Sequence, residues 1–342
     1  MRNLQLLPKA HLHLHFSGSM AVPTLVELAE QSGVDIPLDL LDEHPLRVPY
    51  DKRGWFQFQR LYDRARRVVI NEAVMRRIVT EAAQADASEG SRRLEIQIDP
   101  SSYAPFVGGL AAAVEIVLDE ARQASRETGV QVGVIIAASR IRHPLDARTL
   151  ARLAARYSGE VIGFGLSNDE YSGSTEDWEG AFRIARKAGL AGVPHGGELR
   201  GPKHVRRIVK ALQPTRLGHG IRATEDPATL DWVIEQGIAF EVNPASNVAL
   251  GVYRNLSDVP LRSLVNAGAT VALGADDPLL FLSRLTDQYE IARGLGFSDP
   301  ELAELARGSI RASLASDDDK ARWLGEVDDW LISPDTDLSV TQ

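Results

Sequence analysis

The sequence contains no cysteine, and this absence excludes disulfide bonds and every metal site built from thiolates. It is consistent with a reducing cytosol, and we expect a cytoplasmic protein. There is also no run of about 18 apolar residues that could cross a membrane. The N-terminal segment reaches the charged stretch at residues 8–11 without the apolar centre of a signal peptide. We therefore expect no membrane partner.

Positive charge is scarce relative to negative charge: 38 lysines and arginines stand against 47 aspartates and glutamates, and the net charge is −9. The basic residues form no stripe, and the arginine-rich segment 66–77 has the pattern of a solvated helix face. Nucleic acid is therefore not an expected partner. The remaining composition, with 44% hydrophobic and 25% charged residues, is that of a globular protein.

Short apolar or β-branched runs alternate with longer amphipathic segments along most of the 342 residues. Amphipathic segments such as 24–34 and 110–130 repeat apolar residues every three or four positions and end near glycine. This alternation predicts an α/β fold, a parallel (β/α)₈ or TIM barrel, in a single domain over residues 1–325. The predicted strands are residues 11–15, 93–98, 131–138, 161–164, 192–194, 216–218, 239–242 and 270–273.

Two regions depart from the alternation. Residues 33–66 follow the first strand and its helix, and within them Trp55, Phe58 and Tyr62 share one helical face. This region is either a helical lid over the barrel mouth or a satellite core beside it. Residues 326–342 are acidic and rich in turn-forming residues, and we expect them to form a frayed C-terminal tail.

Three histidines lie two residues apart in the first predicted strand, at His11, His13 and His15. Alternate side chains of a strand point the same way, so neighbours in this row are roughly 6.5–7 Å apart. Two neutral imidazoles at that separation can bind one cation with Zn–N bonds of about 2.0–2.1 Å. The alternative is a row of surface histidines on an exposed strand.

Other polar side chains follow the ends of later predicted strands. His195 and Glu198 follow the fifth, His219 the sixth, and Asp276 with Asp277 the eighth. Barrel active sites are assembled at the carboxyl ends of the strands, so these side chains are expected to converge with the histidines of the first strand.

These motifs, H-x-H, H-x-G-E, G-H-G and D-D-P, resemble the adenosine deaminase family of amidohydrolase barrels in both order and spacing. The resemblance spans nearly the whole chain. It implies one Zn²⁺ per chain, bound by His13, His15, His195 and Asp276, while His11 falls where many members carry a glutamate.

The resemblance also implies the catalytic roles. The metal would lower the pKa of a water from 15.7 to about 7, and His219 would orient that water. Glu198 would donate a proton to N1 of a purine, and Asp277 would accept or share a proton with N7. The predicted fourth strand lacks the bridging lysine usual in two-metal amidohydrolases, which favours one metal. The absence of cysteine excludes the P-C-x-x-C deaminase fold.

Several residues around the expected substrate differ from the family pattern. The H-x-H-x-D-G motif of adenosine deaminases ends here in Ser17 and Gly18, so a hydroxyl replaces the carboxylate that contacts the ribose 5′-hydroxyl. Asn168 replaces a glycine whose N–H faces purine N3, and Gln97 occupies a usual arginine position. Residues 242–247 read V-N-P-A-S-N where C-P-x-S-N is common.

We therefore expect a zinc hydrolase that deaminates a small-molecule 6-aminopurine, with adenosine converted to inosine and ammonia as the favoured reaction. Ser17, Gly18, Asn168 and Asp277 are the expected substrate contacts, together with the apolar face of Trp55, Phe58 and Tyr62. The missing carboxylate and this apolar face suggest tolerance of 5′-modified nucleosides. Adenine is a second alternative, and an inactive purine-binding protein is a third, disfavoured by the full catalytic set. The sequence does not indicate an oligomeric state.

Overall fold

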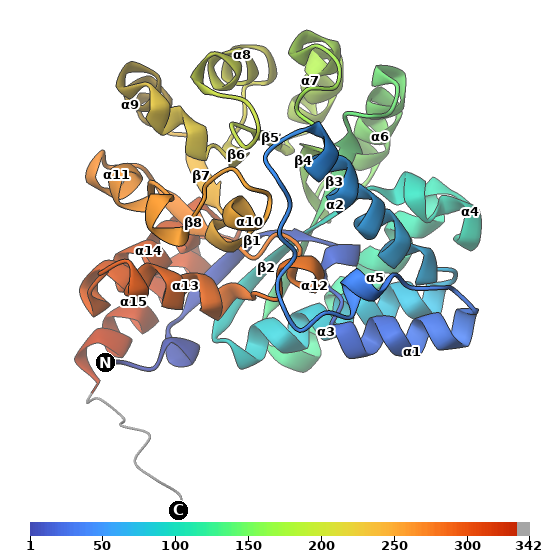
Figure 1. The fold of residues 1–342 in the computed structure, drawn as a ribbon, viewed down its shortest axis with the longest axis horizontal. Helices are drawn as coiled ribbons and strands as arrows, with labels where there is room; N and C mark the ends of the chain where they lie inside the picture. Colours follow the sequence, from blue (N-terminus) through green and yellow to red (C-terminus); the bar gives the residue numbers. More distant parts are fainter. Residues whose placement is uncertain (334–342) are drawn as a thin grey trace, which may run out of the picture.

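Eight parallel strands form a barrel with the strand order β1-β2-β3-β4-β5-β6-β7-β8 in the computed structural model, which describes residues 1–333 (Figure 1). The predicted (β/α)₈ fold is confirmed. Parallel hydrogen bonding between β1 and the segment after β8, at Leu14 and Asp276, brings the two ends of the sheet together. The strands are β1 Lys9–His15, β2 Ser91–Ile98, β3 Gln131–Ser139, β4 Val161–Ser167, β5 Ala191–Gly196, β6 Arg216–His219, β7 Ala239–Val242 and β8 Val271–Leu273.

Helices surround the strands, and local signals in the sequence set their ends. The side chain of Asn71 accepts a hydrogen bond from Val74 N at the start of α3, and Gly33 ends α1 with a φ of 66°. The helices are α1 Val22–Ser32, α2 Lys52–Ala65, α3 Glu72–Ser88, α4 Ala104–Val107, α5 Leu110–Thr128, α6 Pro144–Arg156, α7 Glu179–Lys187, α8 Pro202–Leu212, α9 Pro227–Glu235, α10 Pro244–Ala249, α11 Leu261–Asn266, α12 Pro278–Phe281, α13 Leu285–Gly294, α14 Asp299–Ala312 and α15 Asp317–Ile332. Among the described residues, no helix is both long and apolar enough to span a membrane.

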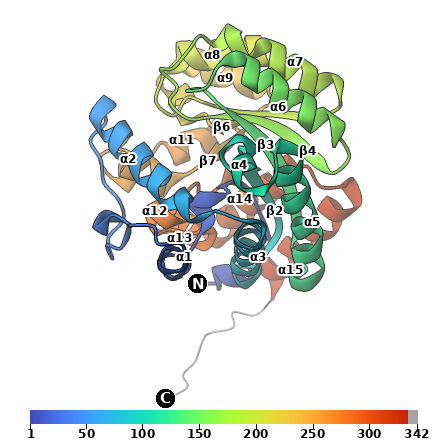
Figure 2. The same ribbon diagram turned by 90° about the vertical axis from the view of Figure 1, so that its right-hand side faces the viewer.

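The region 33–66 consists of an irregular segment followed by α2. Backbone hydrogen bonds from Leu46 N to Leu280 O (3.0 Å) and from Val48 N to Ala249 O (2.9 Å) attach the irregular segment to α12 and α10, the short helices that follow β8 and β7. Helix α2 lies beside α12 in both views (Figures 1 and 2), and the rings of Phe58 and Phe281 stack there at 5.7 Å. The region is thus packed against the carboxyl-end side of the barrel.

The C-terminal region differs from its prediction. A frayed tail from residue 326 onward was expected, but α15 continues to Ile332. Trp323, Val327 and Trp330 recur at helical spacing and are buried, and Trp330 Nε1 donates to Asn3 O at 3.0 Å. The predicted start of the tail is therefore wrong, because burial of this apolar helix face stabilises α15 despite the acidic residues on its other side. Residues 334–342 of the predicted tail lie outside the described part of the chain.

Candidate active site

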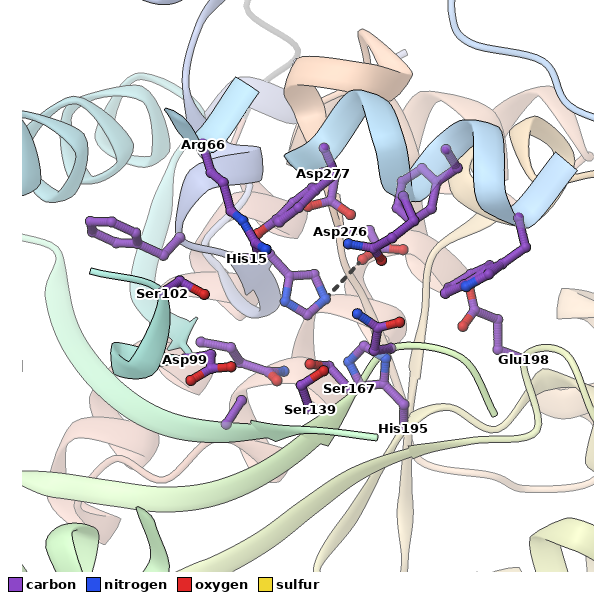
Figure 3. A pocket seen from close by; sticks show the side chains of 18 of the residues that line it. His15, Arg66, Asp99, Ser102, Ser139, Ser167, His195, Glu198, Asp276 and Asp277 are labelled. Carbon is purple, nitrogen blue, oxygen red and sulfur yellow. Dashed lines mark ion pairs between the residues drawn. The ribbon is translucent and has the colours of Figure 1, made fainter. Parts of the chain in front are cut away.

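Four histidines and an aspartate converge at the carboxyl ends of the strands. His13 and His15 lie in β1, His195 in β5 and His219 at the end of β6, while Asp276 follows β8. The ring centroids of His13 lie 4.8 Å from those of both His195 and His219. Asp276 Oδ1 lies 3.4 Å from His13 Nε2 and 3.2 Å from His15 Nε2, the second of which is drawn in Figure 3.

This cluster fits a divalent metal ion. The Nε2 atoms of His13 and His195 are buried and have no hydrogen-bond partner among the described residues. Possible ligand atoms of His13, His15 and Asp276 lie within 4.8 Å of one another, and so do those of His13, His195 and His219. Imidazole nitrogens and a carboxylate without any thiolate are a donor set typical of zinc in hydrolases.

His11 is not part of this cluster and makes structural contacts. Its Nδ1 lies 2.9 Å from Asp86 Oδ1, and its Nε2 accepts a hydrogen bond from Ala275 N at 3.1 Å. His11 and His13 are buried, so the alternative of surface histidines on an exposed strand is wrong.

A carboxylate below the cluster orients His13. Glu241 Oε2 lies 2.7 Å from His13 Nδ1, so the proton of a neutral His13 sits on Nδ1 and leaves Nε2 free to bind a cation. The other oxygen of Glu241 accepts from Arg216 Nε at 2.6 Å, and Arg216 Nη2 donates to Glu95 at 2.6 Å. Arg93 Nε also pairs with Glu95 at 3.1 Å, so that two buried arginines neutralise two buried carboxylates inside the barrel.

Glu198 is buried beside the cluster, with Oε2 3.6 Å from His219 Nε2. Burial raises the pKa of Glu198 well above its usual value, and the negative charges of Asp276 and Glu170 raise it further. The carboxylate of Glu170 accepts hydrogen bonds from the backbone N–H groups of Glu198 (3.1 Å), Leu199 (3.0 Å) and Arg200 (2.7 Å). Glu198 is therefore held by its backbone, and its raised pKa favours the protonated carboxyl group.

His219 and Asp276 have positive φ angles of 66° and 63°, a backbone conformation that non-glycine residues rarely adopt. Burial lowers the pKa of His219 to about 3, so its ring is neutral. Its Nδ1 lies 3.3 Å from Asn243 Nδ2, and Ser246 Oγ donates to Asp276 Oδ2 at 2.6 Å. Residues of the V-N-P-A-S-N segment thus orient both side chains.

Asp277 lies next to the cluster with its Oδ1 buried and without a hydrogen-bond partner in the described chain. Burial raises the pKa of Asp277 well above its usual value, and the charge of Asp276 adds to this. A Cβ atom at position 18 would lie 1.8 Å from Asp277 Oδ1. Glycine at position 18 is therefore needed for Asp277 to hold this position.

A pocket opens from these residues (Figure 3). Trp55, Phe58 and Tyr62 of α2 line it, as does Asn168, whose φ of 75° explains how asparagine fits where a glycine is usual. Ser17 and Gly18 are buried but are not among its lining residues, and Ser17 Oγ is hydrogen-bonded to the hydroxyl of Tyr103.

Sequence reasoning missed the residues that support the site. Glu241 and Glu170 were not assigned a role, because their partners lie 228 and 28–30 positions away along the chain. Arg140 was missed as well: it is buried, and its Nη2 donates to His195 O at 2.7 Å. A charged residue within or just after an apolar strand was the available signal for all three.

Comparisons with known proteins agree with this geometry. A family model described as adenosine deaminase matches residues 8–330. A Streptomyces virginiae protein named "Putative adenosine/adenine deaminase" is 57% identical over 333 residues, covering 96% of this chain and 98% of that protein. An adenine deaminase of Agrobacterium fabrum is 30% identical, with coverages of 94% and 98%. The crystal structure of an adenine deaminase from Arthrobacter aurescens superposes with a TM-score of 0.88 at 28% identity, covering 96% of this chain and all of that one (100%). The chain belongs to the adenosine deaminase family and is a hydrolytic deaminase.

Proposed function

We propose that this protein catalyses the zinc-dependent hydrolytic deamination of a 6-aminopurine, with adenosine converted to inosine and ammonia as the favoured reaction. The observation that carries the proposal is the position of Glu198, a buried carboxyl group whose Oε2 lies 3.6 Å from His219 Nε2 at the edge of the histidine and aspartate cluster. A proton donor beside a hydrolytic metal site is what the deamination of an aromatic amidine requires.

His13, His15, His195 and Asp276 would hold one zinc ion, since the buried Nε2 atoms of His13 and His195 have no hydrogen-bond partner in the described chain. Zinc bound there would supply the Lewis acidity that makes a water nucleophilic near neutral pH. His219 is left out of the proposed ligand set. Its neutral ring would accept a proton from the attacking water and hold that water toward C6.

Glu198 would donate its proton to N1 of the purine. Protonation there makes C6 electrophilic, and the raised pKa of Glu198 keeps that proton available. Asp277 would hydrogen-bond to N7 on the other side of C6 and share a proton with it. The raised pKa of Asp277 favours the protonated carboxyl group that this requires. Two protonated carboxyl groups flanking C6 would fix the ring with its amino group toward the metal and favour departure of ammonia.

Region 33–66 is proposed as a lid over this site. Trp55, Phe58 and Tyr62 line the pocket from α2 and would cover the ring, which would exclude bulk water during the reaction. Asn168 would present its backbone N–H to N3. Ser17 does not line the pocket, but its Oγ is hydrogen-bonded to the hydroxyl of Tyr103, which does, so Ser17 would act on a 5′-hydroxyl through a pocket-lining tyrosine.

Adenine is the second candidate substrate, because a 30% identical relative is named adenine deaminase. The test is ammonia release by the zinc-loaded protein from adenosine, adenine and 5′-deoxyadenosine, with cytidine as a control. Release from one of the aminopurines and none from cytidine supports the proposal. In Glu198→Gln, turnover should fall about 10²–10⁴-fold while purine binding persists. Binding without turnover in the native protein would indicate an inactive purine-binding protein.

A further inference from the structure

A second cavity, of about 400 Å³, lies beside the active-site pocket. Its walls come from the segment that leads into α2, from the loops after β4 and β5, and from the end of α10. Trp55 and Leu250 line both this second cavity and the active-site pocket, so the two spaces adjoin each other. A volume of this size is within the range of small-molecule pockets. The second cavity can therefore take part of a ligand that is bound in the active-site pocket.

The walls of the second cavity suit an apolar group. Tyr50, Trp55 and Tyr171 are among its lining residues. The carboxylate of Asp169, at its edge, already accepts hydrogen bonds from Tyr171 N at 2.9 Å and from Ser172 Oγ at 3.0 Å. None of the described residues that line this cavity has a buried polar atom without a hydrogen-bond partner. Because nothing here calls for a polar ligand, an aromatic or aliphatic group is the better match.

The aromatic walls are attached to the residue that follows the proposed proton donor. The carbonyl oxygen of Leu199 accepts hydrogen bonds from the hydroxyls of Tyr50 and Tyr171, the second at 2.9 Å, and from Arg222 Nη1 at 2.5 Å. These bonds join the segment before α2 to the loops after β4, β5 and β6. The second cavity is therefore formed in the free protein, and a ligand would not have to open it.

Purine geometry determines which part of a substrate faces the second cavity. C2 lies between N1 and N3 on the six-membered ring. In the proposed orientation Glu198 meets N1, and the backbone N–H of Asn168 meets N3. Leu199 and Asp169, the next residues after these two along the chain, both line the second cavity. A substituent on C2 would therefore point between the two loops and into this space.

We propose that the second cavity is a subsite for an apolar substituent on C2 of the purine, with an aromatic ring as the best match for its walls. The substrate class then extends to 2-substituted 6-aminopurines. This inference rests on the proposed deaminase function and on its placement of N1 at Glu198. A substituent on the 6-amino group is the rival occupant, since C6 also adjoins N1.

The test measures kcat/KM of the zinc-loaded native protein for adenosine, 2-phenyladenosine and N6-benzyladenosine. The value for 2-phenyladenosine should lie within about 10-fold of that for adenosine, because the phenyl ring has a cavity to enter. A value more than about 10-fold below that for adenosine would overturn the subsite. If N6-benzyladenosine is then turned over efficiently, the second cavity belongs to the amino substituent.

Two substitutions alter the second cavity without touching the active-site pocket. Ser172→Phe should fill it and lower kcat/KM for 2-phenyladenosine by at least about 10-fold, with that for adenosine unchanged. Tyr171→Ala should remove an aromatic wall and lower the value for 2-phenyladenosine alone by about 3- to 10-fold. Tyr171→Phe is the matched control, because it keeps the ring and removes only the hydrogen bond to Leu199 O. It should leave the ratio of the two substrates unchanged.

The ratio of the two substrates cancels any loss of folded protein. Equal losses on adenosine and 2-phenyladenosine in Ser172→Phe and Tyr171→Ala would overturn the subsite while leaving deamination in place. Failure to release ammonia from any aminopurine would overturn the proposed function itself. The ratio of dissociation constants for the two nucleosides, measured by calorimetry in the same proteins, would then decide the subsite by the same criteria.

Discussion

His13 Nδ1 and Glu241 Oε2 lie 2.7 Å apart, and the same carboxylate is bonded to the buried Arg216. This contact selects the His13 tautomer that is protonated on Nδ1, and it leaves an unprotonated Nε2 toward the cluster. Glu241→Gln should therefore weaken zinc affinity by about 10- to 100-fold. Competition with a metal chelator measures this without reference to activity. Glu120→Gln is the control, since Glu120 is a buried carboxylate on α5 paired with Arg76. Equal zinc affinity in native protein and Glu241→Gln would show that His13 needs no such partner.

The proposed ligand set predicts a division among the four histidines of the cluster. Zinc content should be one per chain, and alanine at His13, His15 or His195 should abolish or sharply reduce it. Asp276→Ala should do the same. His219→Ala should retain most of the metal while losing turnover, because its proposed role is to orient water. Elemental analysis of the purified variants decides between these outcomes. Loss of zinc from His219→Ala would place His219 among the ligands.

The contact between Glu170 and the backbone of residues 198–200 predicts a change in pH dependence. Glu198 acts when protonated, so activity is present below its pKa and is lost as pH rises through it. The negative charge of Glu170 contributes to raising that pKa, after burial and Asp276. Glu170→Gln should therefore move the alkaline limb of kcat/KM to lower pH. The exposed pair of Glu176 with Arg207 supplies the control Glu176→Gln. If the alkaline limb lies at the same pH in Glu170→Gln as in the native protein, the charge of Glu170 does not raise the pKa of Glu198.

The C-terminal helix should contribute to stability. Trp330 is 8% exposed and donates to Asn3 O, whereas Ile332, two residues on, is 79% exposed. Trp330→Ala should lower the free energy of unfolding by about 3–5 kcal/mol, while Ile332→Ala should change it by less than about 0.5 kcal/mol. Urea denaturation of both variants provides the comparison. Equal stability of the two variants would instead support the frayed C-terminal tail that we expected from the sequence.

Much of the fold could be predicted because the barrel strands are short apolar runs separated by amphipathic helices. The predicted strand at 239–242 coincides with β7, and the one at 11–15 lies within β1. The cluster could be predicted because His13, His195, His219 and Asp276 each lie close to the carboxyl end of a strand, where a parallel barrel brings side chains together.

The supporting contacts could not be predicted in the same way. The bond between His13 and Glu241 joins residues 228 positions apart, and that between Ser17 and Tyr103 joins residues 86 apart. Such pairs depend on rotamers and register that a single sequence does not specify. Ser17 illustrates this, because position 17 was identified while its hydrogen-bond partner Tyr103, which lines the pocket, was not.

The most direct test of hydrolytic deamination at this site is the reaction of the zinc-loaded protein with adenosine in ¹⁸O-labelled water, followed by mass spectrometry and ammonia determination. We predict inosine that carries one ¹⁸O atom at C6, one ammonia per inosine, and loss of both in Glu198→Gln. Adenosine recovered unchanged, with adenine and 5′-deoxyadenosine also unchanged under the same conditions, would contradict the account.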